Sequence, residues 1–155
     1  ELEVLVLEDL PKVRSIEPLR ALTKLVALDY SGGIWNRNHA ETLEPLTDLP
    51  VLEELWLTNL QVERDGLRPV ARCPGLKELI VHNRFETADY AYLAARRPDV
   101  ACDHFAPWIA VGIEGADRMV VGKRKPFLDS RTDGERLARY EREWARLVSE
   151  SNQQR

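Results

Sequence analysis

Long apolar runs and cysteines are both scarce in this sequence of 155 residues. No stretch approaches the roughly 20 apolar residues that a membrane-spanning helix needs, so we expect no membrane association. The first residues have neither the basic segment nor the apolar stretch of a secretory signal. The two cysteines, Cys73 and Cys102, are too few for a disulfide framework. These absences predict a reduced, cytoplasmic protein.

Basic charge is also in short supply over most of the chain. The formal net charge is −4, and residues 1–105 carry 12 Lys and Arg against 18 Asp and Glu. A nucleic-acid-binding surface needs a basic face, so we expect no nucleic-acid partner. Residues 106–155 reverse the balance, with 10 basic residues against 8 acidic ones. Arginine greatly outnumbers lysine, which is typical of a GC-rich bacterial genome.

What the sequence does contain is an apolar pattern that returns four times in phase. Each copy has the spacing L-x-x-L-x-L, and successive copies begin 23, 27 and 24 residues apart. The copies are 2–7, 25–30, 52–57 and 76–81, with Tyr30 and Val81 in place of the last leucine. In a short strand, the last two apolar positions point to the same side. We therefore expect them to face a core in every copy.

A second piece of sequence recurs between these copies, and it contains a proline each time. The three pieces are Ile16–Leu19, Leu43–Leu46 and Leu67–Val70. Proline is tolerated in the first turn of a helix, where its missing N–H costs nothing, so we predict a short helix in each repeat. A degenerate fifth repeat continues with a helix around Tyr90. Its last strand, within residues 100–105, has two open registers: one points Asp103 and Phe105 inward, and the other points Val100 and Cys102 inward.

Four phased L-x-x-L-x-L copies with a proline-containing partner resemble the leucine-rich repeat family, whose unit is about 20–29 residues long. The resemblance covers about residues 2–105. It implies an α/β solenoid of short parallel strands and short helices, with the parallel sheet on the concave face. Asparagine often follows the core leucines in this family, but Leu10, Gly33, Leu60 and Arg84 stand at those positions here. We therefore expect irregular turns, with a glycine-opened loop over residues 31–39.

Residues 106–155 break the period, and we expect them to form a C-terminal cap. Two β-like runs flank a turn signal at residues 114–117 and predict a hairpin. Thr132 and Glu135 have the spacing of a capping box, which predicts the start of a helix. That helix would carry one apolar stripe, formed by Leu137, Tyr140, Trp144, Leu147 and Val148. Because a repeat array must cover its last repeat, we predict repeats over 1–105 and a hairpin-plus-helix cap over 106–155.

The concave strand face is where repeat proteins of this kind usually bind, because its side chains form an array on a rigid sheet. Three outward rows are expected: Val4, Ala27, Glu54 and Glu78; Val6, Asp29, Trp56 and Ile80; and Glu8, Ser31, Thr58 and His82. Tryptophan is frequent at the centre of protein interfaces, and the acids around it favour a basic protein partner. The predicted binding residues are Asp29, Glu54, Trp56, Thr58, Glu78 and His82, with Trp35 in the longest loop as a further candidate.

No catalytic or metal-binding signature accompanies this surface. The three histidines lack the spacing of metal ligands, so we expect no metal and no cofactor. Cys102 and His104 could share a strand face as thiol and base, but a buried structural cysteine is the favoured interpretation. The basic segment Lys123–Lys125 lacks the flanking pattern of a phosphate loop and is interpreted as a solvated turn.

The main hypothesis is therefore a protein–protein recognition module without enzyme activity. A second hypothesis makes the chain the substrate-recognition arm of a larger enzyme or effector. The sequence starts on a strand and lacks an initiator methionine, so a cap or further repeats are expected upstream of Glu1. A third hypothesis is a small thiol enzyme that uses Cys102 and His104.

Overall fold

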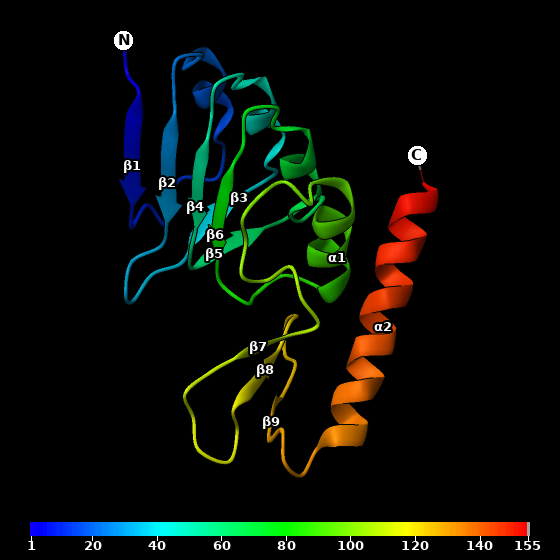
Figure 1. The fold of residues 1–155 in the computed structure, drawn as a ribbon. Helices are drawn as coiled ribbons and strands as arrows, with labels where there is room; N and C mark the ends of the chain where they lie inside the picture. The colour runs from blue at the N-terminus through cyan, green and yellow to red at the C-terminus, as the bar shows by residue number, and fades with distance from the viewer. Residues whose placement is uncertain (155) are drawn as a thin grey trace.

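Four parallel strands form a sheet in the first half of the chain, and short helices accompany them in a mixed α/β structure (Figure 1). The computed structural model describes residues 1–154. The sheet has the order β1-β2-β4-β6, and its strands are β1 (Val4–Glu8), β2 (Ala27–Ser31), β4 (Glu54–Leu57) and β6 (Glu78–Val81). Each strand comes from one of the four repeated copies, so the repeat predicts the strands correctly.

The register of this sheet aligns equivalent positions of the repeats. Leu28, Leu55 and Leu79 pair across neighbouring strands and are 1%, 0% and 2% exposed. The residues that precede and follow each of these leucines along its own strand point to the opposite side, because side chains alternate along a strand. The predicted inward direction of these leucines is confirmed.

A layer of 3₁₀ helices packs against the inner side of the sheet. These helices are η1 (Glu17–Ala21), η2 (Glu44–Asp48) and η3 (Arg68–Arg72), each with proline in its first turn. Their buried side chains include Leu19, Leu46 and Val70, which join the strand leucines and Cys73 in one core. The expected short helices are therefore present, in the tighter 3₁₀ form that suits pieces of so few residues.

The fourth repeat ends in a true α-helix, α1 (Thr87–Arg96), which buries Tyr90 and Leu93 in the same core. The next segment makes only a single parallel bridge, between Glu78 and Ala101, and not the strand that the fifth repeat predicts. Val100 is buried there and Asp103 is exposed. Cys102 and Phe105 are both partly buried against the core, so the segment follows neither of the two open registers completely.

A second, two-stranded parallel sheet lies at the edge of the repeats and was not predicted. Its strands are β3 (Asn38–Ala40) and β5 (Leu60–Val62). The fully buried Asn38 side chain accepts a hydrogen bond from the Leu10 N–H at 2.7 Å and donates one to the Ser31 carbonyl at 2.8 Å. Asn38 thus satisfies the turn between the first two repeats, from a sequence position other than the one usual in leucine-rich repeats.

Residues 106–154 form a three-stranded antiparallel sheet and a long helix. The elements are β7 (Trp108–Ala110), β8 (Arg118–Val120), β9 (Phe127–Leu128) and α2 (Gly134–Gln153). The predicted hairpin is β7 and β8, and β9 adds a strand that was not predicted. A small separate core of Val120, Leu128 and Leu137 holds the start of α2 against this sheet.

Helix α2 runs beside α1, as Figure 1 shows in red and green. The Arg96 side chain joins the two helices by donating a hydrogen bond to the Ser151 carbonyl at 3.3 Å. The predicted capping box is wrong. The helix begins at Gly134 with Asp133 as its N-cap, and no side chain caps its first turn. Instead, the Asp133 carboxylate accepts a hydrogen bond from the Asp129 N–H at 2.9 Å, so it closes the preceding turn.

Among residues 1–154, no helix combines the length and apolar character required for crossing a membrane.

Candidate functional site

The open side of the parallel sheet carries the residues that the repeat pattern predicts to point outward. Two rows follow from the register: Val4, Ala27, Glu54 and Glu78, and Val6, Asp29, Trp56 and Ile80. Each of these side chains is exposed or half-buried, whereas Leu28, Leu55 and Leu79 on the other side of the sheet are buried. The sheet therefore presents a fixed array of apolar and acidic side chains, which we call the sheet face.

Trp56 lies near the middle of the sheet face. Trp56 is 43% exposed, and the strand register places it between Asp29 on β2 and Ile80 on β6. Glu54 on the same strand is also exposed. An indole with apolar area, an N–H donor and carboxylates around it can contact both apolar and basic groups.

The third predicted row, at the carboxyl ends of the strands, is only partly correct. Ser31 is buried at 7% exposure, because it is held within a chain of side-chain hydrogen bonds. Thr58 Oγ1 donates to Ser31 Oγ at 2.9 Å, and Ser31 Oγ donates to the Asp29 carboxylate. This chain fixes the orientation of the Asp29 carboxylate on the sheet face.

His82 ends the same row and is exposed at the rim of the sheet. Its Nδ1 accepts a hydrogen bond from the Asn59 N–H at 3.2 Å, so in the neutral ring the proton lies on Nε2. Partial burial of the ring at the rim lowers the pKa of His82, and the nearby Arg84 guanidinium lowers it further. Both effects favour the neutral ring, whose Nε2–H can donate a hydrogen bond.

Trp35 does not share the sheet face. It lies in the loop after β2 with an exposure of 92%, next to Ile34 at 90%. The loop lines a hollow of about 530 Å³, which we call the smaller hollow, together with Thr58 and His82. The predicted binding residues thus form two groups: Asp29, Glu54, Trp56 and Glu78 on the sheet face, and Thr58, His82 and Trp35 at the smaller hollow.

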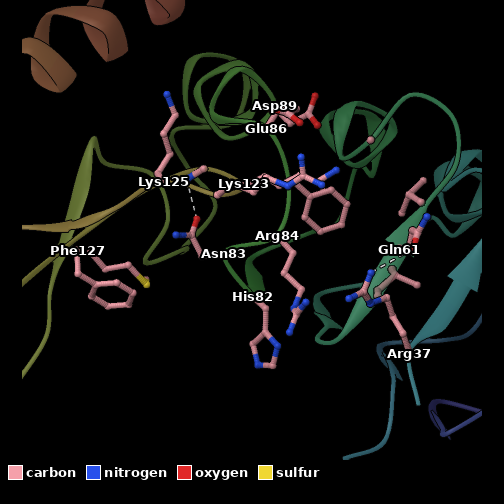
Figure 2. A pocket seen from close by; sticks show the side chains of 17 residues that line it. Arg37, Gln61, His82, Asn83, Arg84, Glu86, Asp89, Lys123, Lys125 and Phe127 are labelled. Carbon is pink, nitrogen blue, oxygen red and sulfur yellow. Dashed lines mark hydrogen bonds between the residues drawn. The ribbon is translucent and has the colours of Figure 1, made fainter. Parts of the chain in front are cut away.

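A larger hollow of about 900 Å³ adjoins the smaller one, and sequence reasoning missed it. Figure 2 shows His82 and Arg84 extending into it from the loop after β6, with Arg37 beside Gln61. The basic turn at Lys123–Lys125, interpreted from the sequence as a solvated turn, forms part of its wall. No repeat position marks these residues, because the hollow forms only when the C-terminal sheet folds against the rim of the repeats.

Cys102 and His104 do not form a thiol and base pair. Burial raises the pKa of the Cys102 thiol to about 11, so it stays protonated at neutral pH and is a poor nucleophile. The His104 ring stacks on Tyr90 with 5.3 Å between centroids, and its Nε2 has no hydrogen-bond partner among residues 1–154. Both side chains contribute to packing beneath the fourth repeat, which is the role favoured for Cys102 from the sequence.

Across residues 1–154, no three His, Cys, Asp or Glu side chains are grouped so that they could hold a metal ion. The polar groups on the sheet face and around the hollows are hydrogen-bond donors, acceptors and fixed charges. Such groups can recognise a partner through complementary charge and shape.

No protein-family model matches the chain, and no curated protein matches it in sequence. Among solved structures, the chain is similar to an internalin from Listeria monocytogenes, with 22% identity and a TM-score of 0.41. The similarity covers 56% of this chain and 30% of the internalin chain.

Proposed function

We propose that the chain is a protein-recognition module that binds a partner on its sheet face. The observation that carries the proposal is the exposed Trp56, fixed by a paired strand on each side and surrounded by carboxylates. A large aromatic side chain on a rigid support loses little conformational entropy on binding, so it makes an efficient anchor.

The charges on the sheet face give the proposed partner its character. Asp29, Glu54 and Glu78 surround Trp56, and no basic residue stands in the two outward rows. Complementary charge speeds association and excludes acidic partners. The proposed partner is therefore a protein with a basic surface and an apolar residue that contacts the indole.

The proposal also includes the finer architecture. Residues 1–105 form a leucine-rich-repeat solenoid whose concave side is the sheet face, and residues 106–155 form its C-terminal cap. Supporting observations are the stacking of η1 on η2 and of η2 on η3, and the packing of the cap residue Val121 in the core of the repeats. A rigid stack of this kind holds the sheet face in place before a partner arrives.

The test uses affinity capture from cells that produce the protein, followed by titration of the captured protein. Trp56→Ala should weaken its affinity by about tenfold or more, as expected when a central aromatic anchor is lost. Glu54→Lys should mainly slow association, with a larger effect at low salt. Circular dichroism checks that both variants are folded.

Trp35→Ala is the matched control, because it removes the same side chain from a loop outside the sheet face. It should leave the affinity unchanged. Unchanged affinity in both the Trp56 and Glu54 variants would refute binding on the sheet face. A loss confined to Trp35→Ala would place the site at the smaller hollow.

A further inference from the structure

Basic side chains gather in one concave region of an otherwise acidic protein. The chain has a net charge of −4, yet Arg37, Arg84, Lys123 and Arg124 all line the larger hollow. We call these four residues the basic quartet. None of them forms an ion pair with another residue among those the structure describes. Like charges that line one hollow without partners raise its positive potential, and an anionic ligand would be attracted to it.

The acidic groups near the quartet do not compensate its charge. Asp89 also lines the larger hollow, but it pairs with Arg68 at 3.6 Å. A fifth basic residue, Lys125, pairs with Glu143 of α2 at 3.4 Å, and Figure 2 shows its side chain directed away from the quartet. Glu86 alone remains as an unpaired acid among the lining residues of the larger hollow.

The turn that carries Lys123 and Arg124 is held rigidly against the end of the repeats. The Gly122 N–H donates to Asn83 Oδ1 at 2.7 Å, and the Lys123 N–H donates to the Phe85 carbonyl at 2.7 Å. Arg124 adopts a left-handed backbone with φ of 59°, which is unfavourable for a residue with a Cβ atom. The backbone that carries two cationic side chains is thus held in place before any ligand binds, which lowers the entropy cost of binding.

The two hollows adjoin each other, because Arg37, His82 and Arg84 line both, and we call the two hollows together the groove. Apolar side chains lie toward each end of it. Phe127, 49% exposed, lines the larger hollow, and the exposed Trp35 lines the smaller one. The groove therefore offers an apolar contact, a basic centre and a second apolar contact in succession.

We infer that this groove binds an extended acidic peptide segment with an apolar residue on either side of its carboxylates. Arginine and lysine at the centre would pair with the carboxylates, and the aromatic residues at the ends would cover the flanking side chains. A nucleic acid fits less well. A nucleic acid strand carries a long row of phosphates, and the groove offers only the four cations of the basic quartet to pair with them. Glu8 and Glu86 also line the groove, and their carboxylates would repel the remaining phosphates.

The probe is a fluorescein-labelled synthetic peptide with a run of glutamates between a leucine and a phenylalanine. Fluorescence anisotropy measures its binding to the full chain at two salt concentrations. Saturable binding is expected, weaker at the higher salt and lost when every glutamate is replaced by glutamine. A peptide that fails to bind, or a glutamine peptide that binds equally well, overturns the proposal.

Two double variants locate the site. Arg84→Ala with Lys123→Ala should weaken peptide binding by about tenfold or more, because two charge-assisted hydrogen bonds are lost. Arg64→Ala with Lys12→Ala removes the same residue types and the same charge from exposed positions outside the groove, and it should change little. Equal losses in the two double variants would mean that only net charge matters, and that result overturns the proposal.

Two further comparisons complete the test. A single-stranded oligonucleotide of equal charge should bind more weakly than the peptide; tighter binding that is sensitive to the groove variant would identify a nucleic-acid site and overturn the proposal. Trp56→Ala should leave peptide binding unchanged, so the groove and the sheet face can fail independently. Circular dichroism confirms that every variant is folded.

Discussion

Truncation of Leu55 to alanine tests the arrangement on which every surface in this molecule depends. Leu55 lies on β4, between Leu28 on β2 and Leu79 on β6, and it is fully buried. Replacement by alanine removes apolar atoms from the core and leaves a cavity. Removal of a buried leucine side chain typically costs about 2–5 kcal/mol, depending on how far the surroundings can relax.

The surroundings of Leu55 leave little room for relaxation. Both neighbouring strands are paired with β4, and the leucines opposite are themselves 1% and 2% exposed. We therefore expect a loss in the upper part of the range, about 3–5 kcal/mol in the free energy of unfolding. For a protein of this size, each kcal/mol lowers the melting temperature by about 2–4 °C, so a decrease of roughly 6–20 °C is expected.

Urea denaturation and thermal melting of Leu55→Ala measure this loss directly. Leu2→Ala is the matched control, because it is the same substitution in the same repeat pattern at a position that is 47% exposed. The control should stay within about 0.5 kcal/mol of the original chain. Equal stabilities for the two variants would refute the register of the sheet, and with it the outward direction of Trp56.

Two further outcomes follow, one from the packing of α2 and one from the burial of His104. Deletion of residues 133–155 removes Leu137 from its core with Val120, so the truncated chain should aggregate on size-exclusion chromatography; a monomer of unchanged melting temperature would show that α2 is an independent appendage. Burial lowers the pKa of His104 in the folded chain. As the pH falls, the imidazole therefore takes up a proton in the unfolded chain before it does so in the folded chain. The free energy of unfolding should be highest above about pH 6.5 and should decrease as the pH falls further. His104→Phe keeps an aromatic ring on Tyr90 and should flatten that dependence in urea titrations, whereas an unchanged slope would assign it to other groups.

The parts of the fold that the sequence predicts well are those in which one physical rule acts on consecutive residues. Leucine at every second position of a short segment can bury its side chains only on one side of a strand. The positions of Leu28 and Leu55 in the pattern therefore predict that both leucines point inward and that Asp29 and Trp56 point outward. Proline in a first helical turn is an equally local rule, and it places the helical segments correctly.

The parts that the sequence does not predict depend on partners distant in the chain. In the sequence, Asn38 lies in a predicted loop. The structure shows that its side chain accepts a hydrogen bond from the Leu10 N–H, 28 positions earlier in the chain. Asn83 lies one residue before Arg84, which stands where the repeat family often has asparagine, yet its side chain accepts a hydrogen bond from the Gly122 N–H in the C-terminal turn. In the third row, Ser31 follows the outward pattern but is buried by its bonds to Thr58 and Asp29. Side-chain hydrogen bonds of this range leave no periodic mark in a sequence.

The groove is a consequence of the same long-range contacts. A basic turn in isolation is a solvated turn, as Lys123–Lys125 appears in the sequence. It becomes part of a concave basic site because Asn83 and Phe85 bind its backbone and bring it beside Arg84. Besides the basic segment itself, the sequence signals this arrangement through the charge balance of residues 106–155, which is opposite to that of the repeats.

The two proposed surfaces have opposite charge preferences and meet at His82. On one side, Asn59 holds the His82 ring at the rim of the sheet, close to the acidic array around Trp56. On the other side, the ring lines both hollows together with Arg84, whose charge lowers the pKa of His82. A neutral ring at this boundary adds no charge to either surface, so it keeps the acidic array and the basic quartet distinct.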